Sequence, residues 1–230
     1  MTTRIPTPRS STATLDYYLL HAGADDGRAA GLLVEEFVLD DDLCAVGLRS
    51  AGWTAAERDW WSSAAFARAV RTQPGLRART TAVDRRAAEA AYRGLGGGTL
   101  PDEETLRGHF RDDAPLAPRA PLRLGAGPGV HRILFAGEPD DHRIARLSAR
   151  LRLTGAPPPD AVPPGAVATG RLRVNDTELR WDLRRVGGIA WCIDVTSAPA
   201  GGDALRWLLR QLVGVARGHG LVPATVERLG

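Results

Sequence analysis

The stretch VATGRLRVNDTELRWDLRRVGGIAWCIDVTS, residues 167–197, decides how this sequence is expected to fold. It contains three short runs of alternating apolar and polar residues, separated by Asn175-Asp176 and by Gly187-Gly188. Alternation with a period of two is typical of a strand with one buried face, and these dipeptides are typical of hairpin turns. The stretch therefore predicts an antiparallel β-meander. Its inward-facing positions are Leu172, Val174, Leu179, Trp181, Leu183, Ile189, Trp191 and Ile193.

An amphipathic helix is predicted directly after the meander, in DALRWLLRQLVGVARGHG. Asp203 is a favoured N-cap residue, and apolar residues recur at helical spacing while the arginines lie off the apolar stripe. The closing LVPATVERL, residues 221–229, predicts a last strand. The apolar stripe of the helix consists of Leu205, Leu208, Leu209, Leu212, Val213 and Ala216.

The middle of the first half is predicted to be helical. The segment TAAERDWWSSAAFARAVRTQ begins with Thr54 and Glu57 at the spacing of a capping box. Thr81 and Asp84 have the same spacing at the start of a second segment. In a capping box the hydroxyl accepts from an early backbone N–H and the acid reaches back to the cap, so residues 54–111 are predicted as a helical segment.

The segment 15–53 contains two apolar runs, LDYYLLH and GLLVEEFVLDD, that fit strands or short helices. We favour strands because helix caps are few, and we expect a short helix at 41–52. The whole sequence thus predicts an α+β fold, with a helical N-terminal half and a C-terminal antiparallel β-meander covered by an amphipathic helix.

The sequence also predicts a division of the chain. Residues 1–14 are rich in Thr, Ser, Pro and Arg and are expected to form a flexible arm. A helix-rich subdomain is expected at 15–113, a connector at 114–128, and an α+β subdomain at 129–230. Within the last, the Pro-rich run at 154–168 is expected to be an extended connector, and the segment just before it fits a helix or a strand.

A glycine-rich loop, GAGPG, invites comparison with the loops that bind nucleotide phosphates. A dinucleotide fingerprint requires G-x-G-x-x-G at the start of a helix, where the helix dipole and free N–H groups hold the pyrophosphate. Here Gly125, Gly127 and Gly129 have the wrong spacing, Pro128 lacks an N–H, and residues 130–135 are typical of a strand. We interpret the loop as a turn between strands.

Composition excludes several classes of enzyme. All 30 basic residues are arginine, against 27 acids, which gives a formal net charge of +3. Without lysine the chain has no Schiff-base nucleophile, no Walker A phosphate loop, no kinase-type lysine and no Ser-x-x-Lys acyl-transfer site. The near balance of charges also argues against a broad nucleic-acid-binding surface.

Cellular location is predicted from what the sequence lacks. Cys44 and Cys192 are far apart and flanked by apolar residues, which favours buried thiols over a disulfide. No apolar run approaches the roughly 20 residues that a membrane helix requires, and the opening residues do not match a signal peptide. We expect a bacterial cytoplasmic protein that does not contact a membrane.

Candidate site residues fall into three groups. Asp140, Asp141 and His142 are the nearest group of potential metal ligands, but an acidic entrance to a helix explains them better, and we expect neither a metal nor a cofactor. Trp60 and Trp61 cannot both face the core of one helix, so one of them is a candidate partner-binding residue. The third group, a candidate for phosphate contacts with nucleic acid, is Arg171, Arg173 and Arg180.

These patterns leave three functions open. The first is a noncatalytic protein-binding or accessory component, with a protein partner or self-association, since the sequence shows no catalytic constellation. The second is a lysine-independent enzyme, with or without a metal ion, that has a pocket between the halves in which His131 would meet Asp140 or His142. The third is nucleic-acid binding through arginine. No residue is singled out as catalytic.

Overall fold

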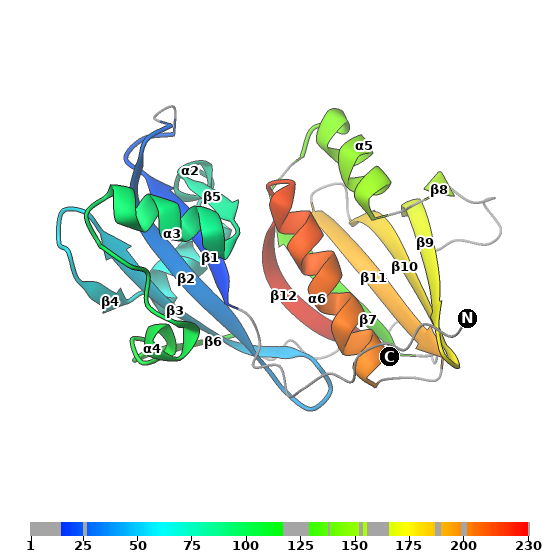
Figure 1. Ribbon diagram of the computed structural model, residues 1–230. Coiled ribbons are helices and arrows are strands. Elements are labelled where there is room, and N and C mark those ends of the chain that lie inside the picture. The colour runs from blue at the N-terminus through cyan, green and yellow to red at the C-terminus, as the bar shows by residue number, and fades with distance from the viewer. Residues whose placement is uncertain are drawn as a thin grey trace, which may run out of the picture.

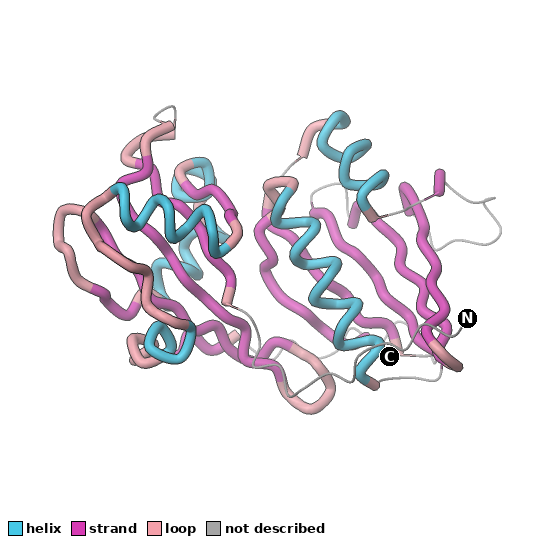
Figure 2. Tube along the Cα trace, in the orientation of Figure 1, coloured by secondary structure: helices cyan, strands magenta, loops and turns pink. Residues whose placement is uncertain are grey.

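The protein consists of two antiparallel sheets that lie side by side and carry helices (Figure 1). Figure 2 shows that strands dominate both halves. We call 15–116 the first half and 129–229 the second half. The predicted arm at 1–14 and the loop glycines before Gly129 lie outside the described residues. The computed structural model describes residues 15–24, 27–116, 129–137, 139–151, 154–155, 166–186, 190–198 and 202–229.

The first sheet has the strand order β4-β3-β2-β1-β5, with β6 paired to β3 beside β4. Strands β1 to β4 form a meander, and β5 returns to pair with β1. The strands are β1 (Asp16–His21), β2 (Ala29–Leu39), β3 (Ala45–Thr54), β4 (Trp60–Ser62), β5 (Thr80–Val83) and β6 (Asp113–Pro115).

Helices cover both faces of the first sheet. Tyr17 of β1 packs with residues of α3 and α4, whereas its neighbour Tyr18 packs with residues of α1 on the opposite face. Because both faces are buried, the central strands are nearly continuous apolar runs instead of alternating ones. The helices of this half are α1 (Ala64–Thr72), α2 (Pro74–Ala78), α3 (Arg85–Gly94) and α4 (Glu103–Arg107).

The second sheet has the order β12-β7-β11-β10-β9-β8, and two helices lie on the same side of it (Figure 1). Its core joins Ile133, Leu183 and Ile193 of the sheet to Leu205 and Leu209 of α6. The strands are β7 (Val130–Ala136), β8 (Thr154–Gly155), β9 (Ala166–Val174), β10 (Thr177–Val186), β11 (Ala190–Ala198) and β12 (Val222–Leu229). The helices are α5 (Asp141–Arg150) and α6 (Asp203–Gly218).

The other face of the second sheet is charged. Asp182 of β10 and Asp194 of β11 are direct register partners there and are 5% exposed each. Arg132 donates to Asp194 at 2.7 Å and Arg184 does so at 2.6 Å. These guanidinium groups outweigh the effect of burial and lower the pKa of Asp194. The carboxylate of Asp194 is therefore held ionised between two arginines.

The predicted fold class was wrong, because the first half, including the expected helix-rich part of 15–113, is built on a sheet. The hydroxyl of Thr54 does accept from Glu57 N–H, at 3.3 Å, as the capping-box interpretation expected. Arg58, however, has a φ of 57°, in the left-handed region, so the chain does not continue as a helix after this turn. The same local chemistry therefore makes the turn between β3 and β4.

The expected helix at 41–52 is also wrong. The carboxylate of Asp40 accepts from Cys44 N–H at 2.8 Å, and Leu43 has a φ of 64°. These features make a tight turn between β2 and β3 instead of a helix start. The strand that follows contains Gly52, where an added Cβ would lie 2.3 Å from the ring of Trp61. Glycine at that position lets the indole lie flat on β3.

The packing of α6 generates a prediction. Leu209→Asp should lower the free energy of unfolding by about 3 kcal/mol or more, because a charge would enter a core site that is 5% exposed. The control is Gln211→Asp, an exposed position on the same helix, which should change stability by less than about 0.5 kcal/mol. Urea unfolding of both variants is the measurement, and equal midpoints would contradict the assigned core.

Candidate binding groove between the two halves

A buried ion pair between α1 and β2 of the first half also reaches the second half. Arg71 donates to the two carboxylate oxygens of Glu35 at 2.5 and 3.0 Å, and the side chains are 5% and 1% exposed. The same guanidinium donates through Nε to the carbonyl of Pro223 on β12, at 2.7 Å. It also donates to Ala67 O at 2.8 Å. One side chain of the first half thus holds the edge strand of the second sheet.

A second arginine makes the reciprocal connection. Arg217, at the end of α6, donates to Asp16 Oδ1 at 2.5 Å, to the hydroxyl of Tyr18 at 3.1 Å and to Tyr17 O at 3.0 Å. Its guanidinium also lies 4.7 Å from the centre of the Tyr18 ring. Because Asp16 and Glu35 are register partners on β1 and β2, both arginines neutralise adjacent carboxylates on one face of the first sheet.

This cluster shifts the proton affinity of its members. Burial raises the pKa of Asp16 to about 6; Arg217 opposes the shift and Glu35 adds to it. Burial also raises the pKa of Tyr18, so its phenol keeps its proton. The side chain of Asp16 nevertheless remains 23% exposed.

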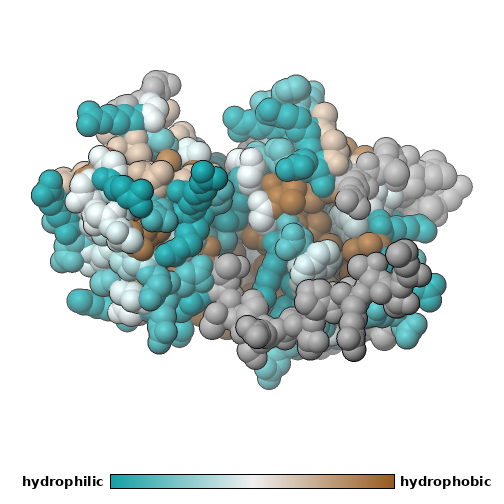
Figure 3. All heavy atoms as spheres, viewed as in Figure 1, coloured by the Kyte–Doolittle hydropathy of each residue, from teal (hydrophilic) through white to brown (hydrophobic). Residues whose placement is uncertain are grey.

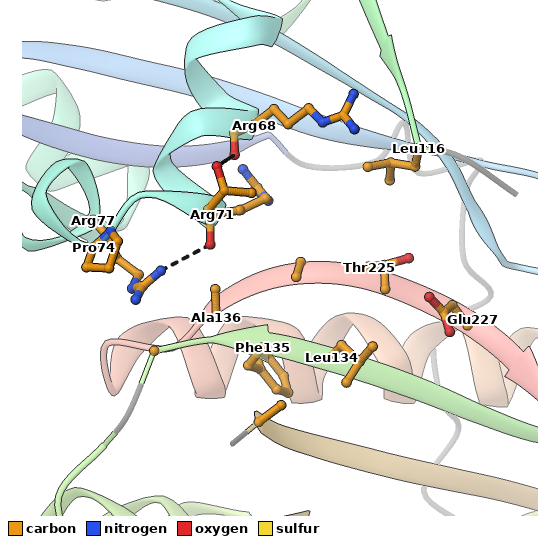
Figure 4. Close-up of a pocket in the computed structure, with 14 residues that line it drawn as sticks. Arg68, Arg71, Pro74, Arg77, Leu116, Leu134, Phe135, Ala136, Thr225 and Glu227 are labelled. Carbon is orange, nitrogen blue, oxygen red and sulfur yellow. Dashed lines mark hydrogen bonds between the residues drawn. The ribbon is translucent and has the colours of Figure 1, made fainter. Parts of the chain in front are cut away.

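A groove of about 820 Å³ lies beside the Arg71 contact, between α1 and α2 on one side and β7, β11 and β12 on the other (Figure 4). Arg68 extends along it toward Leu116, and Arg77 donates to the carbonyl of Arg71 at 3.1 Å. Glu227 is the only carboxylate among the described residues that line it. Opposite the arginines, the floor consists of Leu134, Phe135, Ala136, Gly137, Ala190, Ala224 and Thr225.

A pocket of about 660 Å³ continues this groove, since Pro74, Arg77 and Gly137 line both. We call it the arginine pocket. It lies between α2 and β5 of the first half and α5 and the end of α6 in the second, and none of the described residues that line it is a carboxylate. Its basic residues are Arg77, Arg143, Arg146, Arg217 and His219.

Three of the arginines that line the groove and the pocket have no ionic partner among the described residues. Among the residues that the structure describes, no carboxylate forms a salt bridge with Arg68, Arg77 or Arg146. Arg143 approaches Asp140 at 3.7 Å, across an exposed pair that contributes little binding energy. The groove and the pocket therefore form a continuous surface of positive potential between the halves.

The arrangement does not bring together the residues of the enzyme hypothesis. His131 lies near the start of β7 and donates through Nε2 to Asp42 O at 2.9 Å. Asp140 and His142 follow the other end of that strand, about 15 Å away at a rise of about 3.3 Å per residue. In the described part of the chain, no group of three His, Cys, Asp or Glu side chains could hold a metal ion.

The candidate metal ligands instead form the start of α5. The carboxylate of Asp140 accepts from Arg143 N–H at 2.7 Å, which is N-cap geometry. Asp141 is the acid of the first turn and His142 is exposed. The local chemistry of these residues thus serves the helix.

The two candidate tryptophans lie in β4, not in a helix. Trp60 is half-buried and packs against Tyr92 and His109, with ring centres 5.8 and 5.7 Å away. Trp61 is also half-buried and lies on Gly52. Neither lines the groove. Of the described tryptophans, Trp207 of α6 is the most exposed to solvent, at 48%.

The candidate nucleic-acid residues lie together on the charged face of the second sheet. Arg171 of β9 and Arg180 of β10 are register partners, and Arg173 lies opposite Glu178. Arg180 also forms a salt bridge with Asp182 at 3.1 Å. This face therefore carries acids among its arginines, unlike the arginine pocket.

Sequence reasoning missed Arg68, Arg77, Arg143 and Arg146. They come from three helices in two halves of the chain, so no local motif contains them. The absence of an acid three or four residues away from Arg68 and Arg77 is the only sequence feature that sets them apart.

Comparisons with models of protein families, with curated proteins and with solved structures find no match for this chain. Within the described residues, no helix is long and apolar enough to cross a membrane.

The raised pKa of Asp16 generates a prediction about pH. A carboxyl group whose pKa is higher in the folded state binds its proton more tightly there, so its contribution to stability is complete below pH 4 and is lost as the pH rises through 6. The stability advantage of the wild type over Asp16→Asn should therefore fall by about 1 to 2 kcal/mol between pH 4.5 and 7.5.

Urea unfolding at both pH values measures this difference. Asp176→Asn, at an exposed turn carboxylate, is the control and should show no such change. A wild-type advantage that is constant, or that grows with pH, would contradict the burial of Asp16 in this cluster.

Proposed function

We propose that this protein is a noncatalytic binding protein that holds an acidic segment of a partner protein in the groove between its halves. The observation that supports this proposal is the excess of arginine over carboxylate along the groove and the arginine pocket. The bacterial and cytoplasmic setting remains a prediction from composition.

The groove is complementary in charge to an acidic chain. Arg68 is exposed and Arg77 is half-buried, and neither forms a salt bridge with a described residue. Guanidinium groups bind carboxylates through two parallel N–H donors, so an incoming acidic chain would satisfy donors that this fold leaves available.

The shape of the groove and the arginine pocket also favours an extended chain. The groove and the arginine pocket share three residues and extend from Leu116 to His219, which makes the surface long. A long surface with charges along it fits an extended chain better than a compact cofactor. On the face seen in Figure 3, hydrophilic residues predominate over the first half, and hydrophobic ones show between hydrophilic ones over the second half.

The side chains that line the groove favour binding over catalysis. The described residues that line the groove include no nucleophile paired with a base, and the ionisable ones are arginines apart from Glu227. Arginine stays protonated in proteins and does not exchange protons with a substrate at neutral pH. The groove therefore suits binding and not acid–base catalysis.

The test is binding of a fluorescein-labelled, glutamate-rich peptide to the full-length protein, followed by fluorescence polarisation. Arg68→Gln combined with Arg77→Gln should raise Kd about tenfold or more, because two charge-assisted contacts are lost. The matched control is Arg86→Gln with Arg111→Gln, two exposed arginines of the first half that lie outside the groove.

Two further probes separate the alternatives. Trp60→Ala tests whether the partner contacts β4, and a single-stranded oligonucleotide tests nucleic-acid binding. Peptide binding unaffected by the groove variant, or loss of binding in the Trp60 variant alone, would contradict the proposal. Tight binding of the oligonucleotide without the peptide would transfer the function to nucleic acid.

A further inference from the structure

We propose that the arginine pocket binds a phosphoryl group. This inference rests on the proposed function in one respect, since the pocket continues the groove that would hold the acidic segment. The phosphoryl group would then belong to a phosphorylated side chain of that segment, although a free phosphate compound has the same chemistry.

The pocket is built around two glycines that approach each other. Gly137 and Gly220 have φ values of 122° and 83°, and a Cβ added to Gly137 would lie 3.7 Å from Gly220 O. Arg77 Nε would lie 4.0 Å from that added Cβ, and Arg143 NH1 would lie 3.2 Å from a Cβ added to Gly220. Cations of both halves thus approach these two glycines, and a side chain at Gly220 would crowd Arg143.

The arginine pocket holds more positive charge than one carboxylate would neutralise. Arg217 is already bound to Asp16, which leaves Arg77, Arg143 and Arg146 to face the pocket. A phosphoryl group carries a charge of about −1.5 to −2 and three acceptor oxygens. It therefore matches several guanidinium groups at once, whereas a carboxylate offers two oxygens and a single charge.

His219 provides a reporter at the wall of the pocket. Its pKa is lowered first by burial and then by the charges of Arg146 and Arg150. The charged groups that line the pocket with it are Arg77 of α2, Arg143 and Arg146 of α5 and Arg217 of α6. A dianion placed among them would offset their field and raise the pKa of His219.

The first experiment is an NMR titration of the His219 ring protons, assigned with His219→Gln, in inorganic phosphate and in chloride at equal ionic strength. Phosphate should raise the pKa of His219 by about half a unit or more. Arg146→Gln should abolish this response. The matched control is Arg150→Gln, which also removes a charge that acts on His219 but does not line the pocket, and it should keep the response.

Two results would overturn the inference. One is a His219 pKa that is the same in phosphate and in chloride for the wild-type protein. The other is equal loss of the response in the Arg146 and Arg150 variants, which would indicate a general effect of charge on the ring and no bound phosphate.

A second experiment distinguishes the source of the phosphoryl group and separates this inference from the proposed function. Glutamate-rich peptides with and without one phosphoserine are compared, and the phosphorylated one should bind about tenfold tighter, an advantage that Arg146→Gln removes. Equal binding of both peptides, with no His219 response to phosphate, would sink the phosphoryl site and leave the proposed function standing. A His219 response without binding of either peptide would support the site for a free phosphate compound and contradict the proposed function.

Discussion

Two buried arginines that cross between the halves determine the shape of this protein. Arg71 reaches from α1 to β12, and Arg217 reaches from α6 to β1, so each half supplies a cation to the other. Their carboxylate partners Glu35 and Asp16 are neighbours across two strands. Leaving one of these charges buried without its partner would be strongly destabilising, since an unpaired buried ion retains its desolvation cost. The pairing therefore sets where the second sheet sits relative to the first.

The position of the groove follows from that contact. The guanidinium of Arg71 contacts Pro223 and Glu35. Arg68 lies one turn before it in α1 and Arg77 lies in α2, and both line the open space between α1, α2 and β12. Two helices that follow each other in the chain, α1 and α2, thus supply both the structural arginine and the available ones. The lack of lysine does not weaken this arrangement, because arginine forms bidentate contacts with carboxylates and phosphates that lysine does not.

The sequence predicted the elements that have one buried face. Alternation between residues 167 and 197 marks β9 to β11, and the stripe through Leu209 marks α6, because each packs on one side only. The prediction from sequence failed for β3, because this strand is buried on both sides and its residues do not alternate between apolar and polar. It also failed at Thr54, where a hydrogen bond typical of a helix cap makes a hairpin turn. The candidate groove was out of reach because its arginines meet only after both halves have folded.

Hydrogen–deuterium exchange of the full-length protein, with and without a glutamate-rich peptide, tests most directly whether the groove between the halves is the binding surface. We predict slower exchange of the backbone amides in 64–78, which covers α1 and α2, and in 222–229, which covers β12. Exchange in α3 and β4 should stay the same. Protection confined to the charged face of β9 and β10, or to β4 around Trp60, would contradict the account.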